Sequence, residues 1–472
     1  MRKCAFIWAS HFSPKAEGHG RPWTSAPHYS QLAHGPSQAK HQPIMRIIPI
    51  LLFLALAHVA LAQTEVAKPP QSQQPAADNR FQIPPSDDGL PGAGPIRRQE
   101  WFQKTWTQRR SAFAQRQARD VAGLVFLGDS ITQGWGDEFG GAFPGVRVAN
   151  RGISGDTTRG VLLRLQEDVL SLNPTGIVLL IGTNDLEEKA DPETIAGNLK
   201  LIIAELKKHN GKMPIVLCQV MPSSESKKRP ADKIKKVNEL YAAAVKGDPQ
   251  ITLVETWTLF ADAQGDAKKD EFPDLLHPNK VGYAKWAAAI RPILATLGYL
   301  ETEPDDFTLE PGFVSLFNGR DLTGWGYRTN NFDGRTTSSE GRYVAKNGRL
   351  IVTTPPEGRK IAQLYTTREF PKNFVLKLEF RATPNADSGV FIRKPQLQCR
   401  DYPLAGPYKT LTQYKPQDWN EMVVTVKDGV AHCTCNGEVL EAALKLPETG
   451  PVGLEGDRGQ MEYRRIRLQE TD

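Results

Sequence analysis

Short apolar runs alternate with amphipathic stretches between residues 120 and 300. The most regular amphipathic stretch is 193–208, where Asp191 is placed to cap a helix and Pro192 suits its first turn. Such alternation predicts an α/β domain, residues 99–300, in which a parallel sheet is covered by helices on both faces. The predicted strands are 124–127, 146–149, 176–181, 215–220 and 251–254.

A helical pattern also precedes the first predicted strand. From residue 99 to residue 120, Phe102, Trp106 and Phe113 are spaced by four and seven positions and therefore share one helix face. We expect this helix to pack onto the α/β domain.

After Pro304 the period changes from helical to alternating. An acidic stretch, 301–306, reads as a linker, and in 374–380 apolar residues occupy every second position. Val424 and Val426 continue the alternation, and Asn436-Gly437 is typical of a hairpin turn. These features predict an all-β sandwich over residues 311–472.

The N-terminal 98 residues carry no pattern of a folded domain. Within a leader of residues 1–62, Met45-Arg46 precedes an apolar run that ends at Ala60-Leu61-Ala62, a signal-peptide pattern over 45–62. We therefore expect export to the periplasm or the outside of the cell, with Met45 as a candidate start; a retained membrane anchor is the alternative, although the run is short for a span. The Pro- and Gln-rich residues 63–98 predict a disordered spacer.

Charge and cysteine content narrow the function classes. The net charge of +6 over 472 residues is concentrated in the leader, which holds six Lys or Arg and one acid, so 53 bases face 52 acids afterwards. A near-neutral body indicates no nucleic-acid partner. If the signal peptide is removed, we expect no stable membrane span in the mature chain. The five cysteines form neither a disulfide scaffold nor a zinc spacing, although one disulfide from Cys399 to Cys433 or Cys435 stays open.

Unusual polar residues follow the predicted strands. Gly128-Asp129-Ser130 ends the first, residues 150–155 end the second and 182–185 end the third. Ligand sites of parallel sheets lie at these carboxyl ends, so Ser130 is the candidate nucleophile. Taken alone, Gly-Asp-Ser is equally a turn and helix-cap sequence.

A serine nucleophile needs a base, and histidine is the natural one. Beyond the leader the chain has His209, at a helix end, His432, in the β region, and His277. Only His277 shares the domain of Ser130 and follows a carboxylate, Asp274, by three residues, a spacing that lets the carboxylate fix the imidazole tautomer. The backbone N–H groups of Ser130 and Gly152 and the side-chain amide of Asn184 are the expected oxyanion donors.

These blocks resemble the SGNH (GDSL-type) hydrolases over residues 120–298. The stretches 128–135, 182–185 and 276–279 are similar to the platelet-activating-factor acetylhydrolase-like branch. The resemblance implies a flavodoxin-like three-layer sandwich, no metal or other cofactor, and deacylation of small esters.

The β region resembles the 3-keto-disaccharide hydrolase domain, a concanavalin- or laminin-G-like jelly-roll sandwich. The motifs lie at 316–325, 387–393, 415–420 and 450–455. Gln396 stands where the family pattern has a carboxylate, which puts glycoside chemistry in doubt. Arg393, Gln398 and Asp401 are candidate sugar contacts, with a buried polar network as the equal alternative.

Together these features predict an exported serine esterase that removes a small acyl group, acetyl above all, from carbohydrate or another small ester. Two rival interpretations remain: cleavage of 3-keto-disaccharides by the C-terminal domain, or a glycan-binding protein with an inactive esterase site. The intact set of esterase residues disfavours the second.

Overall fold

The computed structural model describes residues 81–300, 305–353, 363–401, 408 and 410–472. The predicted signal peptide and the first part of the predicted spacer lie outside the described residues. Within those ranges, no helix combines the length and the apolar character that crossing a membrane requires.

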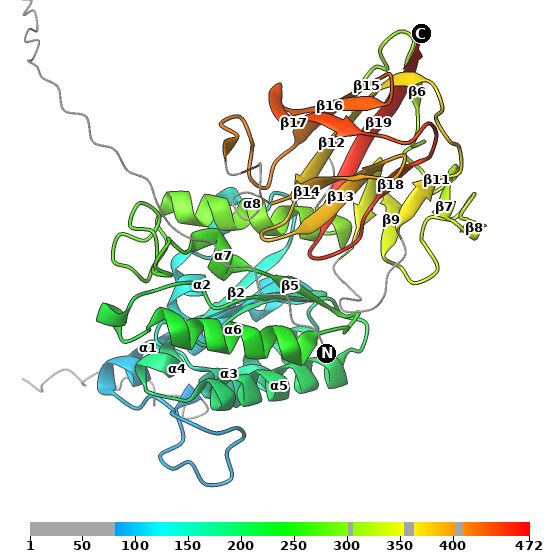
Figure 1. Ribbon diagram of the computed structural model, residues 1–472. Coiled ribbons are helices and arrows are strands. Elements are labelled where there is room, and N and C mark those ends of the chain that lie inside the picture. Colours follow the sequence, from blue (N-terminus) through cyan, green and yellow to red (C-terminus); the bar gives the residue numbers. More distant parts are fainter. Residues whose placement is uncertain (1–80, 301–304, 354–362, 402–407, 409) are drawn as a thin grey trace, which may run out of the picture. The chain divides into compact units, whose positions relative to one another are not determined.

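Five parallel strands form the sheet of the first folded part, in the order β2-β1-β3-β4-β5 (Figure 1). This is the flavodoxin-like order, and the ends of β1, β2 and β3 therefore lie side by side. The second strand continues past residue 149, where its prediction ended. The polar side chains of Asn150 and Arg151 can be buried there because hydrogen bonds satisfy them. The strands are β1 (Leu124–Gly128), β2 (Val148–Gly152), β3 (Gly176–Leu180), β4 (Ile215–Cys218) and β5 (Ile251–Val254).

Helices cover both faces of this sheet. Along β1, Val125 and Leu127 pack into an apolar cluster with α3, α5 and α6, whereas Leu124 and Phe126 pack into a second cluster with α8. The α/β domain is therefore a three-layer sandwich. Its helices are α1 (Glu100–Asp120), α2 (Ser130–Gly134), α3 (Thr158–Asp168), α4 (Thr183–Glu187), α5 (Pro192–His209), α6 (Ala231–Val245), α7 (Thr256–Phe260) and α8 (Lys280–Thr296), with 3-10 turns η2 (Phe139–Gly141), η3 (Leu170–Leu172) and η4 (Glu225–Lys227).

Helix α1 packs as its pattern predicts. Phe102, Trp106 and Phe113 are buried in one cluster with Ile153, just beyond β2. At α5, Pro192 does occupy the first turn, but Asp191 makes no capping hydrogen bond with its side chain.

Residues 81–98, placed in the disordered spacer by their composition, instead form an ordered arm on the α/β domain. Arg159 donates to the carbonyls of Pro91 and Gly94, and Asn198 bonds both the N–H and the carbonyl of Ala93. Hydrogen bonds to its backbone thus help to hold the arm, and an apolar-poor sequence gives no sign of such contacts.

The second folded part consists of two antiparallel sheets. One has the order β17-β16-β15-β12-β19-β10-β9, with β6 paired to β19, and the other has the order β14-β13-β18-β11-β7-β8. Its strands are β6 (Val314–Ser315), β7 (Trp325–Tyr327), β8 (Asn330–Asn331), β9 (Tyr343–Lys346), β10 (Arg349–Val352), β11 (Leu364–Thr366), β12 (Asn373–Ala382), β13 (Asp387–Ile392), β14 (Gln396–Arg400), β15 (Asn420–Lys427), β16 (Val430–Cys435), β17 (Glu438–Lys445), β18 (Val452–Leu454) and β19 (Met461–Thr471).

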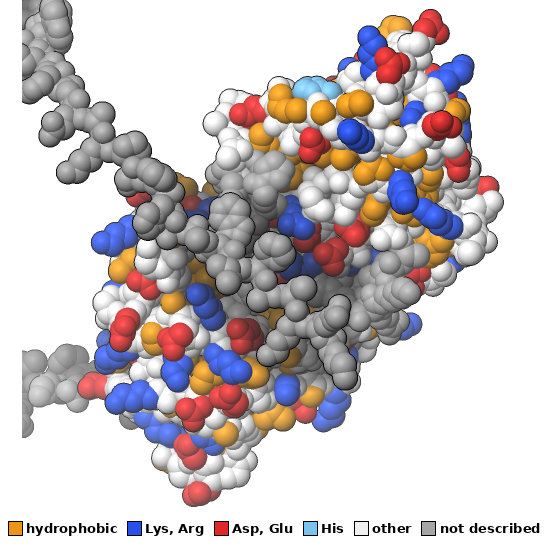
Figure 2. All heavy atoms as spheres, in the orientation of Figure 1, with side chains coloured by type: hydrophobic (Ala, Val, Ile, Leu, Met, Phe, Trp, Pro, Cys, Tyr) orange, Lys and Arg blue, Asp and Glu red, His pale blue; other side chains and the backbone are white. Residues whose placement is uncertain are grey.

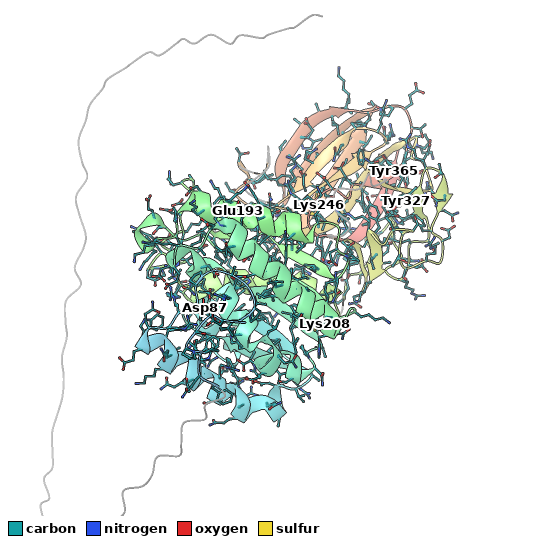
Figure 3. All side chains as sticks on the ribbon, turned by 90° about the horizontal axis from the view of Figure 1, so that it is seen from below. Asp87, Glu193, Lys208, Lys246, Tyr327 and Tyr365 are labelled. Carbon is teal, nitrogen blue, oxygen red and sulfur yellow. The ribbon has the colours of Figure 1, made fainter. Side chains whose placement is uncertain are left out.

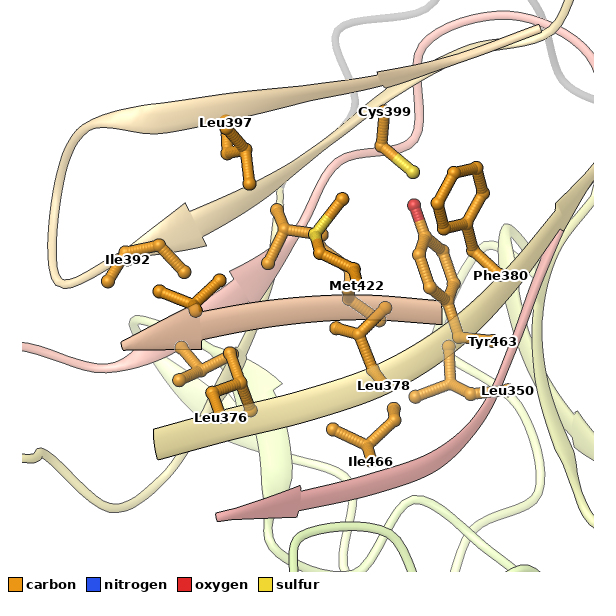
Figure 4. Packing of buried hydrophobic residues seen from close by; sticks show 14 of the residues in the cluster. Leu350, Leu376, Leu378, Phe380, Ile392, Leu397, Cys399, Met422, Tyr463 and Ile466 are labelled. Atoms are coloured by element: carbon orange, nitrogen blue, oxygen red, sulfur yellow. The ribbon is translucent and has the colours of Figure 1, made fainter. Parts of the chain in front are cut away.

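Both sheets contribute to one apolar core. Leu376, Leu378 and Phe380 of β12 face inward, as the alternation predicts, and meet Ile392 of the other sheet and Tyr463 of β19 (Figure 4). This part is therefore a β-sandwich. The four described cysteines, Cys218, Cys399, Cys433 and Cys435, are all buried free thiols, so the disulfide left open from sequence is not formed.

Lys and Arg side chains are interspersed with Asp and Glu on the visible face of each folded part (Figure 2). Neither sign gathers into a continuous patch there. The distribution agrees with the near-neutral body of the sequence.

Candidate active site

Three predicted side chains, one of them 147 residues from His277 in the sequence, are joined by hydrogen bonds. The Ser130 Oγ lies 2.9 Å from His277 Nε2, and His277 Nδ1 lies 2.7 Å from Asp274 Oδ2. Ser130 begins α2 directly after β1, while Asp274 and His277 lie in the loop before α8. These three hydrogen-bonded side chains can pass a proton from the hydroxyl to the imidazole while the carboxylate fixes the imidazole tautomer.

Local hydrogen bonds shape the loop that carries the histidine. Asp274 Oδ1 accepts from the backbone N–H groups of Leu276 at 3.1 Å and His277 at 2.7 Å. Burial by itself would raise the pKa of Asp274, but these bonds outweigh it and the net pKa is lowered. The carboxylate is thus kept ionised opposite the imidazole.

The expected oxyanion donor Gly152 requires a correction. Its N–H donates to Asn150 Oδ1 at 2.9 Å, and a Cβ there would lie 2.3 Å from the backbone nitrogen of Gln133. Gly152 therefore serves close packing of β2 against α2. The glycine that reaches the cavity is Gly155, in a left-handed conformation with φ +87°, and its N–H has no hydrogen-bond partner among the described residues.

Asn184, the other predicted donor besides Ser130, lies in the same cavity on α4 and is buried. Its Nδ2 donates to the Asp156 carbonyl at 2.9 Å, which leaves a second amide hydrogen. Its Oδ1 accepts from Arg229 Nη2 at 2.8 Å. Arg229, which the sequence did not single out, thereby helps to fix the orientation of the amide beside the cavity.

Buried carboxylates lie beneath the site. Burial raises the pKa of Asp129 to about 7, and it raises the pKa of both Asp156 and Asp185 to about 6 against the hydrogen bonds that oppose it. Asp129 accepts from the Ile131 N–H at the start of α2, and Asp156 pairs with Arg164 at 2.8 Å. These groups hold the backbone around the nucleophile.

The cavity has a volume of about 460 Å³. Among the described residues that line it, Trp101 and Leu276 are the ones with large apolar side chains. The rest of the lining consists of hydroxyl, amide and charged groups and one glycine: Arg97, Ser130, Ser154, Gly155, Asn184, Glu187, Ser226, Lys227, Lys228, Arg229 and His277.

The predicted sugar contacts of the sandwich are used internally. The Arg393 guanidinium donates to the carbonyls of Phe370, Lys372 and Pro447, and Asp401 accepts from Gln417 Nε2 at 2.7 Å. Gln398 is half-buried on β14, with a buried Oε1 that has no partner among the described residues. These contacts agree with a buried polar network, and a role in sugar binding stays a prediction.

A carboxylate does lie beside Gln396, although the sequence motif lacks one there. Gln396 donates to Glu455, which follows β18, and burial raises the pKa of Glu455.

Elsewhere in the sandwich, Tyr327 and Tyr365 line a cavity of about 770 Å³, and Figure 3 labels both side chains.

Comparison with known proteins agrees with this geometry. Residues 126–285 match the sequence model of the GDSL-like lipase/acylhydrolase family, and residues 312–469 match that of a 3-keto-alpha-glucoside-1,2-lyase-like domain, the 3-keto-disaccharide hydrolase family. The first folded part is therefore a GDSL-like acylhydrolase domain, a hydrolase of ester bonds. The chain joins it to a 3-keto-disaccharide hydrolase-like domain, and both resemblances noted in the sequence are confirmed.

The chain matches two human proteins over most of their length. The chain is 28% identical to platelet-activating factor acetylhydrolase IB subunit alpha1 over 181 residues, 37% of this chain and 76% of the relative. It is 29% identical to subunit alpha2 over 190 residues, 39% of this chain and 80% of the relative.

Solved structures with likeness to the chain include a GDSL-like lipase from Bacteroides thetaiotaomicron. It has 29% identity and a TM-score of 0.36, and the match covers 40% of this chain and 98% of that one. A lipase/acylhydrolase from Enterococcus faecalis has 23% identity and a TM-score of 0.31, with 38% and 98% covered.

Proposed function

We propose that this protein is an exported serine esterase that removes a short acyl group, acetyl above all, from an acylated carbohydrate. The observation that carries the proposal is the hydrogen-bonded chain of Ser130, His277 and Asp274 beside an open polar cavity. A glycan-binding protein with a lapsed site would have no need to keep this arrangement.

In the first half-reaction, Ser130 Oγ attacks the ester carbonyl carbon while His277 Nε2 takes its proton. Negative charge develops on the carbonyl oxygen, where the N–H groups of Ser130 and Gly155 and the Asn184 amide would donate. Each such donor is typically worth about 3 kcal/mol in the transition state. The carbon–oxygen bond to the alcohol then breaks, and the alcohol leaves with the proton held by His277.

In the second half-reaction, water attacks the acyl-serine. His277 takes one proton from that water and returns it to Ser130 Oγ as the carboxylic acid leaves. Asp274 stabilises the imidazolium in both halves without becoming protonated itself. The cycle ends with the free enzyme.

The lining of the cavity supports a short acyl group and a polar alcohol. A long acyl chain needs a continuous apolar surface, whereas Trp101 and Leu276 are the large apolar side chains among the described lining residues. The names of the acetylhydrolase relatives support acetyl as the acyl group. The 3-keto-disaccharide hydrolase-like domain supports a carbohydrate alcohol, and the signal-peptide pattern supports export.

The test is hydrolysis of a chromogenic acetyl ester by the full chain and by Ser130→Ala. Loss of the nucleophile is expected to lower kcat by about a thousandfold or more. Ser171→Ala, at an exposed serine away from the cavity, is the matched control. Equal rates for Ser130→Ala and the unaltered protein would refute the esterase proposal.

A second candidate function belongs to the sandwich, where Glu455 places a carboxylate next to Gln396. If this carboxylate acts as a proton-transfer group on 3-keto-disaccharides, Glu455→Gln in a Ser130→Ala background should lower their cleavage by about a hundredfold. Product release followed by chromatography measures it, with exposed Glu448→Gln as the control. Absence of cleavage by the unaltered protein would remove this candidate.

A further inference from the structure

One part of the cavity wall comes from α1, outside the matched family region. Trp101, the second residue of that helix, is 50% exposed and lines the cavity together with Ser130. Its ring meets buried Phe102 edge to face at 5.6 Å, and the Arg97 guanidinium lies 5.6 Å from its centroid. The indole is therefore a fixed aromatic surface at the mouth of the site.

Because Gly155 has no side chain, the Trp101 ring can lie close to the backbone at Gly155, a proposed oxyanion donor. A Cβ at Gly155 would lie only 2.5 Å from Trp101 Cη2, so the absence of a side chain allows the close approach. A group stacked on the indole is thus held in the same cavity as the nucleophile.

A second part of the lining is positively charged. Lys227 and Lys228 line the cavity, and neither forms an ion pair with a described residue. Arg97 and Arg229 also line it, but both pair with Glu187. The described cavity wall therefore carries two lysines that are not paired with a carboxylate of a described residue.

Arg229 ties these lysines to the reaction centre. Its Nη1 donates to the Lys227 carbonyl at 2.6 Å, while its Nη2 bonds Asn184. Lys228 adopts a left-handed conformation, with φ 60°, as the turn after η4. The backbone that carries both cations is thus fixed next to the proposed oxyanion donor.

We propose that the alcohol half of the substrate is an acidic sugar, whose ring stacks on Trp101 and whose carboxylate faces Lys227 and Lys228. This inference rests on the proposed esterase function and names its substrate class. The C–H groups of a pyranose ring pack well on the negative face of an indole. A neutral polar alcohol would leave the lysine charges unused, and a quaternary ammonium alcohol would be repelled by them.

The experiment compares three substrates with the purified full chain: acetylated oligogalacturonate, acetylated xylo-oligosaccharide and a small chromogenic acetyl ester. We expect kcat/KM to favour the acidic over the neutral oligosaccharide by about tenfold at low salt, and the preference to shrink as ionic strength rises from about 0.05 M to about 0.5 M. The Lys227→Gln/Lys228→Gln double variant should abolish the preference.

Trp101→Ala should lower kcat/KM for both oligosaccharides, relative to the chromogenic ester, by about tenfold, mainly through KM. The matched controls are Lys208→Gln, an exposed lysine at the end of α5 that Figure 3 labels, and exposed Leu201→Ala; both should leave all three rates unchanged.

The outcomes separate this inference from the esterase proposal. No Ser130-dependent hydrolysis of the chromogenic ester would overturn the esterase itself. Normal hydrolysis of that ester, together with equal rates on acidic and neutral oligosaccharides or with lysine and Trp101 variants that behave like the controls, would overturn the acidic-sugar site alone.

Discussion

The orientation of Asn184 depends on Arg229, a side chain that the sequence did not single out. Its amide oxygen accepts from Arg229 while its Nδ2 donates to the Asp156 carbonyl, and the two bonds together fix the orientation of the amide. Without that bond, the amide could rotate and present its oxygen to the developing oxyanion, which would repel it. Arg229 lies in a polar loop, where a buried arginine and an exposed one look alike in sequence.

We therefore expect Arg229→Met to lower kcat by about tenfold to a hundredfold on the acetyl chromogen, with a much smaller change in KM. Arg229→Lys should recover part of the rate, because an ammonium can still donate to the amide oxygen. Steady-state kinetics measures both, and circular dichroism spectra check that the variants fold. Arg119→Gln, at an exposed ion pair, is the control; an unchanged kcat in Arg229→Met would contradict the positioning role.

At the scale of elements, the arm of residues 81–98 is the largest departure from what the composition predicts. Its Arg97 pairs with Glu187 and Glu188 at the end of α4, and the arm leads directly into α1 and Trp101. Figure 3 labels Asp87, which pairs with Arg98 and Arg159. The arm thus places two residues of the cavity lining.

Asn198→Ala is expected to destabilise the α/β domain by about 2 kcal/mol. Buried Asn198 bonds the N–H and carbonyl of Ala93 and the Thr158 hydroxyl, and its loss leaves these groups without their partner. Urea unfolding measures the change, and Leu201→Ala, on an exposed part of the same helix, should stay within about 0.5 kcal/mol. A shift no larger than that of the control would show that the arm contributes little.

At the scale of the whole molecule, buried carboxylates couple stability to pH. Burial raises the pKa of Asp129 from 3.8 to about 7. Below pH 3.8 the carboxyl is protonated in both folded and unfolded states. Between pH 3.8 and about pH 7, Asp129 is ionised in the unfolded state but still protonated in the folded state. The contribution of Asp129 to the free energy of unfolding therefore falls as pH rises through this interval and levels off above about pH 7.

Asp129→Asn should therefore flatten the pH dependence of the unfolding free energy, by an amount up to about 4 kcal/mol over this interval. Asparagine keeps the ability to cap α2. Urea unfolding at about pH 4, 5.5, 7 and 8 provides the comparison, with exposed Asp191→Asn as the control. Parallel curves for Asp129→Asn and the unaltered protein would contradict the prediction.

The sequence by itself determined the five parallel strands, the all-β second part and the set Ser130, Asp274 and His277, which the structure joins by hydrogen bonds. The strands could be predicted because buried faces produce a periodic pattern of apolar residues. The site could be predicted because its motifs follow predicted strands, whose carboxyl ends meet at one edge of the sheet. Only the tertiary structure decided that Gly155 rather than Gly152 faces the cavity, that Arg229 fixes Asn184, and that residues 81–98 are ordered. These features depend on hydrogen bonds between polar groups distant along the chain, and such bonds leave no periodic trace in sequence.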